Sequence, residues 1–363
     1  MLEMWRETIV ENPGFYLGWG GLLIGTIFGF IVYRTNFCTM GSISDILSFG
    51  DYRRFRSWLL AAGIAMIGVA ILERSGVADF SLAMYVSPNF TWGANIVGGF
   101  VFGIGMVLGG GCVSKNLVRA GGGDLRSLVV LIVIGISAFM TIGGLFGPFR
   151  IAAFTPVTTD LTEMGLSDQR LGSVLSALTG MQAPTASLVA LIIMAGGILV
   201  YCLKDKGFRS SPVHLAAGIG IGLCVIAGWV LTGLAYDEFA DNPTLISLTF
   251  ARPTGDSLDY LMRFTAFSGP GFGVVTTAGV ILGAFLAAIS QKKFALATFS
   301  DTNDTVRNLF GAVLMGFGGV LALGCTIGQA LTGFSTLAIG SGLTFIFIVV
   351  GGIVGMKVME ALA

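Results

Sequence analysis

Long apolar runs, most of them near twenty residues, follow one another along the whole chain with short polar segments between them. A run of this length suits a hydrocarbon core about 30 Å thick, crossed by a helix of roughly 20 residues, better than the ten-residue alternation of a membrane β-barrel. The pattern predicts an all-α integral membrane protein with about nine transmembrane helices. The expected spans are residues 14–33, 57–73, 93–111, 126–147, 184–203, 213–233, 271–290, 308–323 and 340–358.

Composition supports the same fold class. Hydrophobic residues make up 54% of the 363 residues and charged residues only 11%, and the mean hydropathy is +0.87. An ordinary soluble domain is far more polar, and no composition shift marks a soluble domain, so residues 1–363 are expected to form a single polytopic membrane domain. Twenty basic and twenty acidic residues cancel, which gives no basic footprint for nucleic acid.

The positions of the charges predict the orientation. Cytoplasmic loops of membrane proteins carry an excess of Lys and Arg. The acidic amino terminus has no cleavage pattern, so the first span is expected to be retained. Nine spans place every basic cluster on one side, which predicts an inner-membrane protein with a periplasmic amino terminus and a cytoplasmic carboxyl terminus. These clusters are Arg53, Arg54 and Arg56; Lys204, Lys206 and Arg209; Lys292 and Lys293; and Lys357.

A glycine-rich segment ending at Cys112 has a later echo ending at Cys325. In both copies a glycine-rich helix is expected to stop at a Gly-Cys step, and a short polar helix to follow. On the nine-span count the two copies cross the membrane in opposite directions, which predicts an inverted repeat with halves near residues 14–150 and 270–360. The shared glycines are Gly103 and Gly316, Gly105 and Gly318, and Gly111 and Gly324.

Breaks of this kind inside a membrane favour a functional interpretation. Irregular backbone survives in the hydrocarbon region only where protein or a wet cavity satisfies its polar groups, so paired breaks indicate a binding site or a conduction path. A simpler alternative is that the glycines only allow close helix packing. A third polar interruption, around Cys38, predicts a re-entrant or interfacial half-helix between the first two spans.

The five cysteines divide into two kinds. Cys202 and Cys224 lie within apolar runs, where a thiol usually serves as a small hydrophobic side chain. Cys38, Cys112 and Cys325 each lie at a break in the helical pattern. The chain has one histidine and no Cys-x-x-Cys motif, so a zinc, iron–sulfur or haem site is not expected, and no cofactor is predicted.

Thiols beside broken helices suit a small soft anion. A helix amino terminus carries about half a positive charge, and a thiol is a polarisable, weak hydrogen-bond donor. The candidate pathway residues are the three cysteines together with Gly111, Gly324, Lys115, Arg119 and Gln329. For the arginine, a role as a positive-inside anchor is an equally good interpretation.

The three cysteine motifs resemble those of the YeeE/YedE family of sulfur-compound transporters, and especially its members that take up thiosulfate. The likeness covers nearly the whole chain, with the motifs in the same order. The segments that carry it are Asn36-Phe-Cys38-Thr-Met-Gly with Asp45, Gly110-Gly-Cys112-Val-Ser with Arg119-Ala-Gly-Gly-Gly, and Leu314-Met-Gly-Phe-Gly followed by Gly324-Cys325-Thr-Ile-Gly.

This resemblance implies an inner-membrane helical fold with a narrow central waist. It implies a transporter rather than an enzyme, which takes thiosulfate or a closely related sulfur anion from the outer side. Cys38, Cys112 and Cys325 would pass the anion inward through S–H hydrogen bonds, without covalent change. A cytoplasmic sulfurtransferase of the TusA-like type is the implied partner. Other branches of the family are linked to selenium metabolism, which leaves a selenium species as an alternative substrate.

Two other functions stay open from the residues alone. A membrane thiol enzyme or carrier would hold sulfur as a cysteine persulfide, with Lys115 near Cys112 as the group that activates the thiol. A glycine-rich scaffold with no conducted substrate is the third interpretation, and the paired breaks favour it least.

Overall fold

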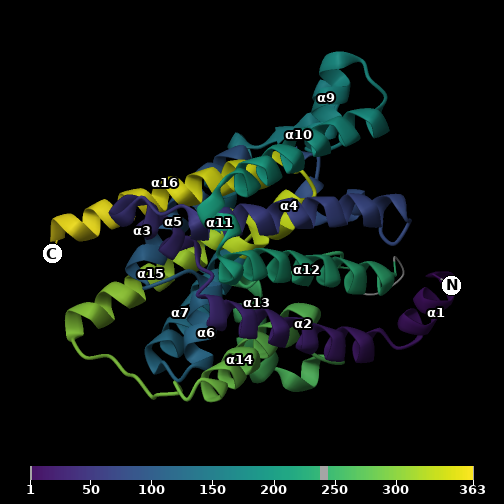
Figure 1. Cartoon of the computed structure of the whole chain (residues 1–363). Coiled ribbons are helices and arrows are strands. Elements are labelled where there is room, and N and C mark those ends of the chain that lie inside the picture. Colours follow the sequence, from purple (N-terminus) through teal and green to yellow (C-terminus); the bar gives the residue numbers. More distant parts are fainter. Residues whose placement is uncertain (1, 238–243, 363) are drawn as a thin grey trace.

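The structure is a computed structural model that describes residues 2–237 and 244–362. It is a bundle of helices with one short strand pair, and the two ends of the chain lie at opposite ends of the bundle (Figure 1). Its α-helices are α1 Leu2–Glu11, α2 Pro13–Thr35, α3 Thr39–Phe49, α4 Arg53–Arg74, α5 Trp92–Leu108, α6 Val113–Gly121, α7 Leu125–Ile142, α8 Gly147–Phe154, α9 Leu171–Thr179, α10 Ala183–Lys204, α11 Lys206–Arg209, α12 Pro212–Leu234, α13 Ala251–Met262, α14 Phe272–Ser290, α15 Thr302–Leu321 and α16 Ile339–Leu362.

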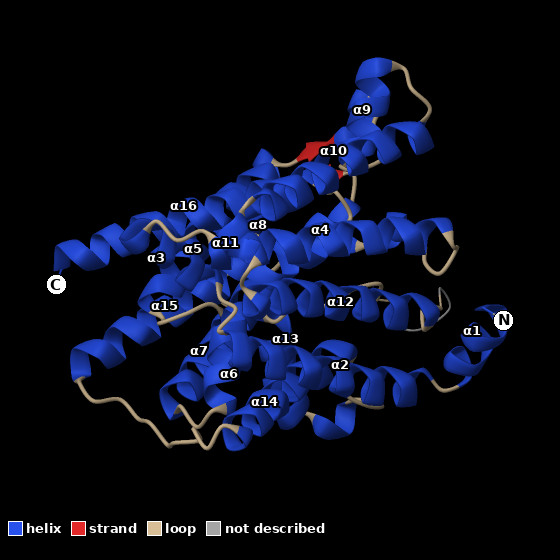
Figure 2. Ribbon diagram, viewed as in Figure 1, coloured by secondary structure: helices blue, strands red, loops and turns tan. Residues whose placement is uncertain are grey.

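The strands are β1 (Asn89–Phe90) and β2 (Thr159–Asp160), which pair antiparallel, with Asn89 opposite Asp160. They form the small red element beside α10 in Figure 2. Among the described residues, regular structure is otherwise helical. The prediction of an all-α membrane protein is confirmed.

Within the residues that the structure describes, eight helical segments are long and apolar enough to cross a membrane. They correspond to eight of the nine expected spans. The remaining one, expected at residues 308–323, is α15, which is less apolar because Asp304, Arg307 and Asn308 lie in its first two turns. α15 nevertheless lies inside the bundle, packed against α5 and α7.

The outer surface of the long helices is apolar. Side chains along these helices, such as Ile71, Ile193 and Leu223, are 61%, 63% and 54% exposed. Large aliphatic side chains gathered on the outside of a soluble protein would be unfavourable, whereas lipid accommodates them. The interior holds aromatic side chains instead, including Trp58, whose ring stacks on Phe37 with 4.8 Å between centroids.

α5 and α15 run antiparallel in direct backbone contact. A Cβ atom added at Gly98 would lie 2.8 Å from the carbonyl oxygen of Gly318, and one added at Gly105 would lie 2.8 Å from that of Gly311. Contacts this short exclude any side chain, so these positions require glycine. The two helices that end at the Gly-Cys steps therefore cross in opposite directions, as the nine-span count predicts.

α2 and α14 also pack through glycines, but they run parallel. Gly21 lies beside Phe272 and Thr276, and Gly29 lies beside Val280. The residue numbers of contacting positions increase together along both helices, so the helices point the same way. A two-fold axis in the membrane plane would reverse one of them, so these two helices are not related by such an axis. The similar glycine spacing of the two helices allows them to pack closely together.

Short helices begin inside the bundle. α3 fulfils the expectation of a half-helix after Cys38, and α6 and a helix of residues 326–335 follow Cys112 and Cys325. The last of these contains a π-helical segment, η6 (Gly328–Gly333). α13 falls in residues 234–268, which were expected to form an outer connection with short amphipathic helices on the membrane face. Its packing against α7, α14 and α15 inside the bundle was not predicted.

Candidate functional site

Each of the three predicted cysteines stands immediately before a helix. Cys38 precedes α3, Cys112 precedes α6 and Cys325 precedes the helix of residues 326–335. All three are buried, with exposed fractions of 6%, 1% and 0%. The backbone N–H three residues further along faces each sulfur, and these groups belong to Gly41, Lys115 and Gly328. The free N–H groups of three helix starts therefore surround the thiols.

The backbone breaks before Cys112 and Cys325 have the same construction. Gly110 and Leu323, each two residues before its cysteine, have left-handed φ angles of 70° and 56°. The next residue in each copy, Gly111 or Gly324, donates its N–H across the helix end to a carbonyl oxygen five residues back, at 2.8 Å in both cases. This closure ends a helix and turns the chain so that a second helix begins at once.

An amide side chain stabilises each break at the equivalent position. The Asn116 side-chain amide donates to the carbonyl oxygen of Gly111 at 2.9 Å and to that of Gly109 at 3.4 Å. The Gln329 amide donates to the carbonyl oxygen of Ala322, the counterpart of Gly109. These bonds satisfy carbonyl groups that the interrupted helices leave open. Gln329 was expected on the pathway, and its Oε1 atom has no hydrogen-bond partner among the described residues.

The structure brings the three thiols together in a fixed order. The Cys112 sulfur interacts with the side chains of Cys38 and Thr326 and lies 3.3 Å from the Ser114 hydroxyl. Cys325 lies within electrostatic range of Cys112. Cys112 is thus the middle member of a series that runs from Cys325 through Cys112 to Cys38.

Uncharged groups surround the Cys325 end of the series. The Thr249 hydroxyl lies 4.0 Å from the Cys325 sulfur and also interacts with the buried hydroxyl of Tyr85. The backbone N–H of Phe250, immediately before α13, faces the same sulfur. Sequence reasoning missed these residues because they come from separate segments without a motif. The nearest signal was the pair of prolines in the connection that contains Phe250.

Basic groups surround the Cys38 end. The Lys115 ammonium group donates a hydrogen bond to the Asn36 side chain, and Lys115 interacts electrostatically with Cys38 and Cys112. Arg54 lies close to Lys115 and forms an ion pair with Asp45 at 3.2 Å. Electrostatics therefore differ between the two ends of the series.

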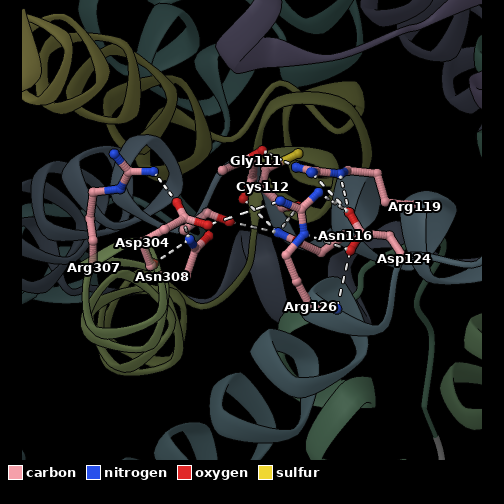
Figure 3. Close-up of polar contacts among 11 residues, drawn as sticks. Gly111, Cys112, Asn116, Arg119, Asp124, Arg126, Asp304, Arg307 and Asn308 are labelled. Atoms are coloured by element: carbon pink, nitrogen blue, oxygen red, sulfur yellow. Dashed lines mark hydrogen bonds and ion pairs between the residues drawn. The ribbon is translucent and has the colours of Figure 1, made fainter. Parts of the chain in front are cut away.

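Arg119 contacts the backbone of the break. It donates to the carbonyl oxygen of Gly110 at 2.9 Å and pairs with the Asp124 carboxylate at 2.9 Å. Figure 3 shows this arginine beside Asp124, with Gly111 and Cys112 nearby. Within the described part of the chain, its hydrogen-bond and ion-pair partners are thus Gly110 and Asp124, and none of the three sulfurs is among them.

The remaining thiols stand apart from the series. The Cys202 thiol donates to the carbonyl oxygen of Arg56 at 3.3 Å, and Cys224 is buried within α12. All five cysteines are free. Across residues 2–237 and 244–362, no three His, Cys, Asp or Glu side chains are grouped closely enough to hold a metal ion.

A family model described as "Sulphur transport" matches residues 34–354, which include all three helix-starting cysteines. The chain belongs to the sulphur transport family. It is therefore a multi-pass membrane protein of a transporter family, in agreement with the YeeE/YedE resemblance of its motifs.

Named relatives cover the chain almost completely. This sulphur transport protein is 29% identical to the thiosulfate transporter TsuA of Spirochaeta thermophila over 92% of its own length and 96% of the relative's. It is 28% identical to TsuA of Escherichia coli over 91% of both chains. The probable transporter YedE of Salmonella typhimurium is 28% identical over a shorter stretch, 29% of this chain and 24% of the relative.

Proposed function

We propose that this sulphur transport protein carries thiosulfate, or a closely related sulfur anion, along Cys325, Cys112 and Cys38 by S–H hydrogen bonds. The observation that carries the proposal is the series of three neighbouring buried thiols, each at the start of a helix. Two similar full-length relatives bear the name of thiosulfate transporters.

Electrostatics explain how a divalent anion could pass this series without a buried arginine against each sulfur. Four helix starts meet here, because α13 begins beside Cys325 as well. Each contributes a partial charge of about +0.5, so together they offer roughly +2. This matches the charge of thiosulfate, and the full positive charge of Lys115 acts only on the Cys38 and Cys112 part of the series.

The chemistry of the thiols favours a sulfur-rich ion. A thiol is a weak, polarisable donor that cannot replace the strong hydration shell of a hard oxyanion such as sulfate. Thiosulfate presents a large polarisable terminal sulfur to the cysteines. The pathway is therefore expected to select by softness as well as by charge.

We assign the transport path to the interface between two inverted halves with a narrow waist. Besides the two matching breaks, Ser42 donates its hydroxyl to the carbonyl oxygen of Cys38 at 2.8 Å, and Thr254 does the same to Phe250 at 2.6 Å. Phe250 thus occupies the position equivalent to Cys38. This correspondence relates α2–α7 to α12–α16 and extends the second half back to Pro212, beyond the expected start near residue 270.

The orientation follows from the charges at the two ends. Arg54 and Lys115 lie at the Cys38 end, and cytoplasmic surfaces are the basic ones. We assign the Cys325 end to the periplasm and the Cys38 end to the cytoplasm, in the inner membrane. A TusA-like sulfurtransferase would then collect the sulfur anion at the Cys38 end.

Competition for uptake tests the proposed substrate class. Proteoliposomes with the full chain are expected to accumulate radiolabelled thiosulfate, and external selenosulfate is expected to compete because selenium is as soft as the sulfur that it replaces. External sulfate at the same concentration is expected to have little effect. Sulfate that competes as well as selenosulfate would show that the pathway selects by charge alone.

A further inference from the structure

A polar cavity of about 230 Å³ lies behind the Cys112 break. Residues of α6, α7 and α15 line it, and Gly110 contributes backbone. Figure 3 shows Gly111, Cys112 and Asn116 between two charged groups, one around Asp124 and the other around Asp304. The side chains that matter here are Arg119, Arg126, Arg307, Asn116 and Asn308. The proposed transport path does not use this cavity.

The cavity has a surplus of positive charge. It contains three guanidinium groups, and two carboxylates partner them. Asp124 binds both Arg119, at 2.9 Å, and Arg126, at 3.0 Å. Burial raises the pKa of Asp124, but the hydrogen bond from Arg126 and the charge of Arg119 outweigh it and hold that pKa below its usual value. The carboxylate is therefore ionised at neutral pH, and the cluster keeps one uncompensated positive charge.

Donor groups are also in surplus. Asp304 pairs closely with Arg307, whereas its distance to a terminal nitrogen of Arg126 is long, at 4.0 Å. A guanidinium group has five N–H donors. The Asp304 carboxylate alone cannot accept all the hydrogen bonds that Arg126 and Arg307 are able to donate. Two partly used guanidinium groups on facing helices form a site that suits a small oxyanion.

The same cavity is connected to the backbone that places Cys112. Arg119 holds the carbonyl oxygen of Gly110 at 2.9 Å, and Asn116 holds the carbonyl oxygen of Cys112 at 3.2 Å. Gly110 has a left-handed backbone, so its position depends on such contacts. An anion that draws Arg119 or Arg126 away from Asp124 would alter the contacts that fix the break.

We propose that this cavity is a second anion site, which binds a small divalent inorganic oxyanion such as sulfate or phosphate and slows transport by loosening the Cys112 break. Its charged guanidinium donors suit the oxyanions that the thiols reject, because they bind oxygen atoms through paired, charge-assisted hydrogen bonds. The cavity lies where α7 and α15 begin. This is also the side where α2 ends, because Tyr33 near the end of α2 lies beside Gly122, shortly before α7. The regulatory part rests on the proposed transport function, whereas the binding part does not.

Calorimetric titration of the purified full-length chain with sodium sulfate in detergent, at constant ionic strength in chloride, tests the binding. Saturable binding is expected, and Arg307→Gln is expected to weaken it roughly tenfold. Asp304→Asn is expected to tighten it by a similar factor, because it frees Arg126 and Arg307 and raises the surplus to two charges. The matched control is Arg263→Gln, immediately after α13, which is 61% exposed and paired with Asp259 and should bind like the native chain.

Opposite results would overturn the site. If Asp304→Asn weakens sulfate binding or leaves it unchanged, the ion pairs serve only to hold α7 against α15. Repeating the titration in nanodiscs with anionic lipid distinguishes the source of the ligand, because a lipid phosphate that fills the cavity abolishes sulfate binding there.

A transport experiment distinguishes failure of the second anion site from failure of the proposed transport function. In proteoliposomes of uniform orientation, sulfate placed on the side where α15 begins is expected to slow thiosulfate uptake by the native chain severalfold and to have less effect on Arg307→Gln. Equal slowing of both would contradict the regulatory role. A chain that binds sulfate but moves no thiosulfate would refute the transport function and leave the binding site standing.

Discussion

Replacing Cys112 with alanine is expected to reduce thiosulfate uptake by roughly 10- to 150-fold. Cys112 interacts with both of the other thiols, so its loss leaves a gap in the middle of the series. A hydrogen bond to a charged group contributes about 1.5–3 kcal/mol. Losing it at the highest energy barrier of the transport path slows passage of the anion by roughly 10- to 150-fold. Initial rates of radiolabelled uptake into proteoliposomes measure the effect.

The matched controls are Cys202→Ala and Cys224→Ala, which remove buried thiols outside the series and should keep native rates. Cys112→Ser should also be slow, since a hydroxyl is harder and more strongly hydrated. Equal uptake by all four variants would rule out conduction by thiols. The intact mass of the native chain after transport should be unchanged, and a gain of one sulfur atom would support the persulfide carrier instead.

Replacing Gly283 with alanine is expected to destabilise the protein by about 2–3 kcal/mol or more. A Cβ atom at this position of α14 would collide with the backbone carbonyl of Thr26 and lie 2.9 Å from the amide nitrogen of Phe30. Backbone atoms cannot rotate away as a side chain can, so α2 and α14 must separate. Thermal unfolding in a mild detergent measures the loss.

Gly196→Ala on α10 is the matched control for Gly283→Ala. No atom lies within 4 Å of a Cβ built at Gly196. Alanine there should be neutral or stabilise the helix by roughly 0.5–1 kcal/mol. If both variants melt at the same temperature, the close approach of α2 to α14 is not required for stability.

Much of the fold could be predicted because a membrane demands long apolar helices. Hydropathy located α15 as well as the eight clearer spans, although polar residues fill its first two turns. It could not locate α13, a half-helix with charged side chains, because such a segment reads as an outer connection. Arg252 on this helix is 71% exposed while Phe250 at its start is fully buried. Only tertiary packing places such a helix inside the bundle.

The site was predictable where a backbone break left a mark in the sequence. Glycine beside cysteine identified Cys112 and Cys325, and each of them immediately precedes a helix. Thr249 and Tyr85 carry no such mark, because an isolated hydroxyl in an apolar segment has no pattern. Arg119 was predicted from its charge, but its contact with the Gly110 carbonyl depends on a left-handed turn that composition does not reveal.

The location of a bound ion tests the central proposal most directly. Crystals of the full chain soaked in selenosulfate would show the selenium by anomalous diffraction. We expect a peak beside the Cys112 sulfur or between it and one of the other two thiols. A peak found only away from all three cysteines, in a chain that transports selenosulfate, would contradict it.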